Sequence, residues 1–255
     1  QGMSAGLLPK LRVLTADITV GSFAQQVQVI AQAAAERRSS YVCCVNAHMT
    51  VEARDPGFAR VVNAADFATA DGMPVLRVMQ LFHKVDQDRV AGNDILPALF
   101  AKAADHGLGV FLFGASDEVQ RKIKERAARE LPNLKIAGNY SPPFAPLKDM
   151  DLASDAARIN GSGAHIVMVS LGCPKQEKWM AAMKGQVNAI MLGVGGAFLL
   201  YAGIDKRAPK WMRDLSLEWV YRLWLEPGRL WKRYVVTNSI FLVLLAQEFM
   251  KRIFR

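Results

Sequence analysis

The chain is poor in the residues that build disulfide frameworks and metal centres. It contains three cysteines and four scattered histidines, and no CxxC or HxxxH spacing occurs among them. A disulfide scaffold and a zinc site are therefore not expected. The adjacent pair Cys43 and Cys44 lies in the apolar run 41–45, which is typical of small buried residues in a strand of a cytosolic protein.

Long apolar runs are also lacking. The most hydrophobic stretch, residues 235–250, is interrupted by polar residues, and its apolar centre covers only residues 241–246. A helix needs roughly 20 apolar residues to span a bilayer. We therefore expect this stretch to lie on a membrane and not to cross it.

Several nucleotide-binding and hydrolytic signatures are missing too. No GxxxxGK[ST] motif occurs, which excludes a P-loop ATPase. The turn Gly193-Val-Gly-Gly196 is not a GxGxxG fingerprint, which disfavours a Rossmann dehydrogenase. The paired carboxylates of glycosidases are not evident.

The most distinctive feature present is the basic C-terminal stretch, residues 207–255. It holds four of the five tryptophans and ten Lys and Arg against four Asp and Glu, a net charge of +6 out of +9 for the chain. Indole rings settle at the headgroup level, and Lys and Arg are attracted by anionic lipids. Nucleic acid is a distant alternative, because the other 206 residues carry a net charge of only +3 and no recognisable nucleic-acid module.

Apolar runs alternate with amphipathic stretches along the first 200 residues. Strands are predicted over residues 11–16, 41–45, 66–69, 109–113, 134–138, 166–170 and 189–192. Helices are predicted over residues 22–37, 56–64, 93–106, 116–131, 150–160 and 174–184. This alternation predicts an α/β fold: a Rossmann-like, largely parallel wound sheet with helices on both faces. We expect an α/β domain over residues 3–206 and a helical, membrane-binding appendage over residues 207–255.

Polar residues or glycines follow four of the predicted strands. They are residues 46–48, 70–74, 171–177 and 193–196. Ligands of such sheets bind beyond the carboxyl ends of the strands, so these segments are candidates for one site.

Each segment also has a purely structural interpretation. Asp71 could cap a helix or act as a general base, and by the residues alone the cap is favoured. Gly195 and Gly196 could cradle a phosphate or form a plain tight turn. Lys175 opposes a helix dipole, which an anionic ligand would explain, but it could equally be a solvated surface residue. Asn93, which follows Arg89, could be a helix cap.

Five signatures, taken in order and spacing, give a more specific indication. They are Asn46, Ala70-Asp71-Gly72, Arg89 with Gly92-Asn93-Asp94, Gly172-Cys-Pro-Lys-Gln-Glu177, and Gly193-Val-Gly-Gly-Ala-Phe198, the last continued by Lys206-Arg-Ala-Pro-Lys-Trp211, Glu218-Trp-Val-Tyr-Arg222 and Glu226-Pro227. In this combination the chain resembles the WecG/TagA/CpsF family of bacterial glycosyltransferases.

The resemblance implies an inverting, metal-independent enzyme without a cofactor. Such an enzyme moves a hexose, of the glucose or N-acetylmannosamine type, from a UDP-sugar to a polyprenyl-diphosphate-linked sugar during surface polysaccharide or exopolysaccharide synthesis. It implies a peripheral location on the cytoplasmic face of the bacterial inner membrane, with an anionic membrane surface and no nucleic acid as partner.

The resemblance also assigns roles by position. Asp71 becomes the general base, which reverses the preference for a cap. The donor and acceptor would be bound by Asn46, His48, Arg89, Asn93, Gly172, Lys175, Gln176, Gly195 and Gly196. Diphosphate and membrane contacts would come from Arg207, Arg222 and Arg229.

Four points stay open in the sequence. His48 could contact the sugar or simply pack, and the donor and acceptor sugars are not specified. The division of tasks among the C-terminal arginines and assembly into a homo-oligomer are also undecided. The alternative function is a non-catalytic, membrane-peripheral nucleotide-sugar-binding protein.

Overall fold

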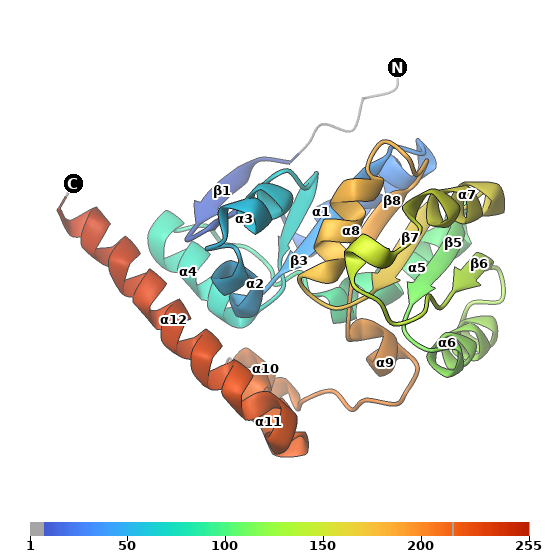
Figure 1. The fold of residues 1–255 in the computed structure, drawn as a ribbon. Helices are drawn as coiled ribbons and strands as arrows, with labels where there is room; N and C mark the ends of the chain where they lie inside the picture. Colours follow the sequence, from blue (N-terminus) through green and yellow to red (C-terminus); the bar gives the residue numbers. More distant parts are fainter. Residues whose placement is uncertain (1–7, 216, 255) are drawn as a thin grey trace.

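A six-stranded parallel sheet forms the centre of the protein. The computed structural model describes residues 8–215 and 217–254, except for the side chain of residue 229. The strands run in the order β4-β3-β8-β7-β5-β6 (Figure 1). Their bounds are β3 Ser40–Val45, β4 Phe67–Ala70, β5 Gly109–Gly114, β6 Lys135–Tyr140, β7 Ile166–Ser170 and β8 Ile190–Gly193. The six strands predicted from residue 41 onward are thus confirmed, with ends that shift by one or two residues.

Helices cover both faces of this sheet, as predicted. One face packs against α1 (Phe23–Ala35), α5 (Gly92–His106), α6 (Asp117–Glu130) and α9 (Ala197–Tyr201). The other packs against α2 (Ala47–Glu52), α3 (Pro56–Asn63), α4 (Met73–His83), α7 (Leu152–Ser162) and α8 (Lys175–Met183). A 3₁₀ turn, η1 (Leu147–Asp149), precedes α7.

The core is divided in two by the sheet, because successive side chains of a strand point to opposite faces. Cys43 packs in the core on the α8 side and Cys44 in the core on the α5 side. Both thiols are buried and unpaired. The interpretation of this pair as small buried residues of a strand is confirmed.

The strand predicted over residues 11–16 is wrong. The segment is a hairpin of β1 (Lys10–Val13) and β2 (Ala16–Thr19), which pair antiparallel around a turn in which Leu14 has φ 54°. A positive φ at a leucine is not expected from its sequence. The hairpin reaches the edge strand β4, where the Ala68 N–H donates to Thr19 Oγ1 at 2.9 Å.

Residues 207–255 are called the C-terminal segment below. Its described residues form three helices: α10 (Lys210–Asp214), α11 (Glu218–Leu225) and α12 (Pro227–Ile253). The long helix α12 runs along one side of the body beside α2 and α4 (Figure 1). Phe241, Leu244 and Leu245 pack against the core on the α8 side, whereas Leu242 and Val243 are exposed. The apolar run 241–246 is therefore shared between the body and the outer face of α12.

Within the part of the chain that the structure describes, no helix is both long and apolar enough to cross a bilayer. This includes α12, whose apolar residues alternate with polar and charged ones. The segment that sequence predicts to lie on a membrane is thus an amphipathic helix of 27 residues.

Candidate active site

The carboxyl ends of β4, β3, β8 and β7 lie next to one another, and a cavity of about 470 Å³ opens above them. The C-terminal helices α11 and α12 form its opposite wall. Of the residues predicted from the sequence, it is lined by Asn46, His48, Asp71, Arg89, Asn93, Gly172, Gln176, Gly195, Gly196, Arg207 and Arg222. Residues separated by up to 176 positions in sequence are therefore brought to one place.

Asp71 sits where β4 ends. Its backbone N–H donates to the Val45 carbonyl at 3.0 Å, which fixes the residue beside the end of β3. Helix α4 begins two residues later, at Met73, with Gly72 at its N-cap position. Asp71 is thus not a helix cap, and the structural interpretation favoured by the residues alone is wrong.

The environment of Asp71 raises the pKa of its carboxyl group to about 6. Burial is the main cause, because it disfavours the charged form, and the nearby carboxylate of Glu218 adds to it. Arg89, Arg222 and a hydrogen bond from the Gly92 backbone act in the opposite direction. A carboxyl group with this pKa is mostly ionised at neutral pH and is more basic than an ordinary aspartate.

Asn46 and His48 line the cavity from α2. Asn46 caps this helix, since its Oδ1 accepts from the Met49 N–H at 3.0 Å. His48 Nδ1 lies 3.4 Å from Thr237 Oγ1 on α12, so the imidazole packs against the C-terminal segment as well as lining the cavity. Burial, and then the charge of Arg233, lower the pKa of His48.

Glycines at the end of β8 and just after it make room for the amide of Gln176. A Cβ at residue 193 would lie 3.2 Å from Gln176 Nε2 and 2.8 Å from Met180 Cε. Gly195 also adjoins this amide and adopts φ +50°. Gly193 therefore allows close packing of α8 on the strand end, which is a structural role independent of any ligand.

Gln176 is in turn held by an acid that sequence analysis did not single out. Its Nε2 donates to Glu177 Oε1 at 2.9 Å, and Glu177 is fully buried. Burial raises the pKa of Glu177 to about 7. The only sequence feature that could have indicated Glu177 is its position next to Gln176.

The structure decides between the interpretations given for Lys175 and Asn93. Lys175 does not line the cavity: its amino group donates to the Ala145 carbonyl at 3.1 Å and lies near the ring of Phe144. Asn93 does line the cavity and is not a cap, because α5 begins at Gly92 after an N-cap at Ala91. The third C-terminal arginine, Arg229, has a side chain outside the described residues.

Ion pairs join the body to the C-terminal segment at the rim of the cavity. Arg207 approaches both carboxylate oxygens of Asp94, at 2.7 and 2.8 Å. Arg89 Nη1 lies 3.3 Å from Glu218 Oε2, and Arg222 Nη2 lies 3.9 Å from the other oxygen of that carboxylate. Three arginines thus line the cavity, and two of them, Arg89 and Arg222, interact electrostatically with Asp71.

Several residues of this wall were not predicted from the sequence to line the site. Arg213, Glu218, Trp219 and Arg233 all line the cavity. Glu218 and Trp219 belong to one of the segments on which the family resemblance rests, but the resemblance assigned no role to either residue. Contacts between α11 and the body carry no local sequence signal.

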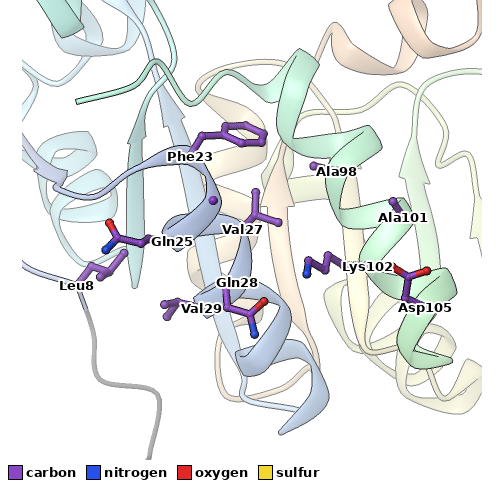
Figure 2. A pocket seen from close by; sticks show the side chains of 11 residues that line it. Leu8, Phe23, Gln25, Val27, Gln28, Val29, Ala98, Ala101, Lys102 and Asp105 are labelled. Atoms are coloured by element: carbon purple, nitrogen blue, oxygen red, sulfur yellow. The ribbon is translucent and has the colours of Figure 1, made fainter. Parts of the chain in front are cut away.

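A second hollow lies between α1 and α5. Figure 2 shows its lining, which is mainly apolar, with Phe23 and Val27 from α1 and Ala98 and Ala101 from α5. None of the four post-strand segments contributes to it. We therefore place the candidate active site at the strand ends.

Among the described residues, no three His, Cys, Asp or Glu side chains are grouped so as to hold a metal ion.

Comparison with known proteins identifies the family. The chain matches the glycosyl transferase WecG/TagA/CpsF family over residues 11–254, which includes all the cavity-lining residues. The chain belongs to this family. It is also 35% identical, over 202 residues, to the N-acetylglucosaminyldiphosphoundecaprenol N-acetyl-beta-D-mannosaminyltransferase of Bacillus subtilis (strain 168). That match covers 79% of this chain and 77% of the relative.

The WecG/TagA/CpsF member described here is therefore a glycosyltransferase. Its cavity combines one carboxylate of raised pKa at the floor with a wall of arginines. A carboxylate can accept a proton from a sugar hydroxyl, and arginines can stabilise a diphosphate. Both groups are of the kind that glycosyl transfer needs.

Proposed function

We propose that this enzyme transfers a hexose from a UDP-sugar to a polyprenyl-diphosphate-linked sugar, with inversion of the anomeric centre and without a metal ion. The observation that carries the proposal is the placement of Asp71. Its carboxylate lies at the floor of the cavity, near Arg89 of the body and Arg222 of the C-terminal segment. A base on one side and cations on the other are suited to opposite ends of a displacement reaction.

The proposed reaction is a single displacement. Asp71 takes the proton of the acceptor hydroxyl while that oxygen forms a bond to the anomeric carbon of the donor. The bond between this carbon and the diphosphate oxygen breaks, and UDP leaves with the electron pair. The nucleophile enters opposite the leaving group, so the configuration inverts.

Charge on the leaving diphosphate must be stabilised by the protein if no metal takes part. We propose that Arg89, Arg207 and Arg222 provide this, together with backbone N–H groups of Gly195 and Gly196. Arg229 is kept as a fourth candidate from its position in the sequence. Gln176, Asn46 and Asn93 would contact the sugar or nucleotide, with Gly172 forming the adjacent rim.

The relative from B. subtilis suggests the type of substrate. Its name describes transfer of an N-acetyl-β-D-mannosaminyl group to N-acetylglucosaminyldiphosphoundecaprenol. We infer an acceptor of the same chemical class for this enzyme, and a donor of the N-acetylmannosamine or glucose type. The product would serve the synthesis of a surface polysaccharide.

A lipid-linked acceptor requires the enzyme to work at a membrane. We propose peripheral binding at the cytoplasmic face through the C-terminal segment, whose side chains of Trp211, Trp224 and Trp231 are exposed. Basic residues of the segment would add attraction to anionic lipids, and interfacial tryptophans would anchor it. Binding of this kind places the cavity, which α11 and α12 border, next to the lipid surface.

A donor screen tests this function. The full chain is incubated with a short-chain polyprenyl-diphosphate N-acetylglucosamine and a panel of UDP-sugars in the presence of a chelator, and UDP release is measured. We expect release with one hexose donor and none without acceptor. No acceptor-dependent release from any donor in the panel would contradict the proposal.

A further inference from the structure

An acid stands among the arginines to which we assign diphosphate binding. Glu218, the first residue of α11, lies 3.3 Å from Arg89 and 3.9 Å from Arg222. Its side chain is 26% exposed, against 14% for that of Arg89. The Glu218 carboxylate thus lies between a guanidinium of the body and one of the C-terminal segment. Asp94 lies in the same way between Arg89, at 3.7 Å, and Arg207.

This arrangement does not suit a site that has only to attract a dianion. A fixed negative charge a few ångströms from a bound diphosphate weakens its binding by Coulomb repulsion. The same carboxylate also disfavours the ionised form of Asp71, the proposed base. Glu218 therefore opposes both functions of the site for as long as it stays between the two arginines.

A carboxylate does, however, satisfy the same donors that a phosphate would. Arginine presents a fork of N–H groups that fits either anion. Without Glu218 or a bound anion in its place, Arg222 would lose the carboxylate that faces it, and the largely buried Arg89 would keep Asp94 but lose its hydrogen-bonded partner on α11. Glu218 therefore stabilises the approach of Arg89 and Arg222 when no diphosphate is bound.

We propose that Glu218 is a positioning residue that occupies the place of the donor diphosphate, holding Arg89 and Arg222 together until the diphosphate displaces it. The inference rests on the proposed function, since it assumes a diphosphate at these arginines. Displacement would free α11 from its ion pair with Arg89, while the Arg207–Asp94 pair still ties the segment to the body. Donor binding is thereby coupled to movement of α11.

Replacing Glu218 by glutamine separates charge from shape. Calorimetry on the full chain, with UDP and inorganic pyrophosphate as probes, should show E218Q binding both about five-fold or more tightly than wild type. A merely structural role would leave affinity unchanged or weaken it. The acid limb of the kcat/KM profile should also move to lower pH in E218Q, because one of the causes that raise the pKa of Asp71 is removed.

Two controls sharpen the test. Glu125→Gln removes the same charge from an exposed residue of α6 that does not line the cavity, and should change UDP affinity by less than about two-fold. In an Arg89→Ala background, the gain from E218Q should shrink, because the pair that competes with the diphosphate is already absent.

The outcomes distinguish the two proposals. If wild type binds UDP and E218Q binds it no more tightly, or only as much more tightly as E125Q does, the proposed role of Glu218 is wrong and the proposed function stands. If neither wild type nor E218Q binds UDP or pyrophosphate, the proposed function fails, and this inference fails with it.

Discussion

Asp71 gains its chemical character from its surroundings. At a strand end before a proline-containing helix, its sequence context is that of a cap. The structure gives the N-cap position to Gly72 and directs Asp71 to the cavity, where burial raises its pKa to about 6. The decisive property is therefore tertiary, and only the family resemblance indicated it from the sequence.

The pH dependence of activity should report this carboxyl group. A base must be ionised, so activity should be low below the pKa of Asp71 and rise as pH increases through it. We expect the acid limb of kcat/KM to have a midpoint near pH 6, where the free enzyme loses the proton of Asp71. A limb centred near the ordinary aspartate value of about 4 would contradict the proposed environment.

Glycine at position 193 should be required for the geometry of Gln176. In Gly193→Ala the new methyl group would lie 2.8 Å from Met180 Cε and 3.2 Å from Gln176 Nε2, so the end of the Met180 side chain must move and the amide is pushed from its position. We expect UDP affinity to fall by about ten-fold, with a stability cost of about 1–3 kcal/mol from overpacking. Isothermal calorimetry and thermal melting measure the two effects.

Gly161→Ala is the matched control for this change. A Cβ at residue 161, inside α7, meets no atom within 4 Å. Alanine also has the higher helix propensity, so this variant should be as stable as wild type or slightly more stable. If both variants bind UDP like wild type, the glycine is not needed to position Gln176.

At the scale of elements, the parallel sheet was the most predictable part. Its strands are short apolar runs separated by amphipathic helices with clear start signals, such as the Ser22 capping box and the Ser116 cap. The hairpin at residues 10–19 was missed because its turn places a leucine at positive φ, where no glycine or asparagine marks it. Local rules could not locate that turn.

Helix α12 shows the limit of composition as a guide. Its apolar run, residues 241–246, indicated a membrane, but Phe241 packs in the core and Leu242 next to it is exposed. Which residues face the body depends on how α12 crosses α2, which no local pattern specifies. Under the proposed membrane binding, only the outer face of α12 is left to contact lipid.

The two faces should respond differently to truncation. Phe241→Ala removes a buried side chain and should cost roughly 3 kcal/mol of unfolding free energy. The double variant Leu242→Ala/Val243→Ala changes exposed residues and should leave stability within about 0.5 kcal/mol. It should instead weaken binding to anionic vesicles on the order of ten-fold.

Thermal melting and vesicle sedimentation measure these two effects. If the double variant sediments with vesicles as wild type does, the outer face of α12 is not the lipid-binding surface.

For the molecule as a whole, the site is assembled across the chain. Strand ends predicted the body side of the cavity, since parallel strands bring their carboxyl ends to one edge. The opposite wall depends on pairs such as Arg89–Glu218 and Arg207–Asp94, 129 and 113 residues apart. Such pairs carry no sequence periodicity, so the sequence could predict basic residues near the site but not their partners.

The central claim is that Asp71 is the base of a glycosyl transfer carried out in this cavity. Its most direct test is Asp71→Asn in the full chain, with turnover read as UDP release and binding read by calorimetry with UDP. We predict that transfer falls by at least about a hundred-fold, while UDP affinity stays within a few-fold of wild type. Turnover like that of wild type in this variant would contradict the account.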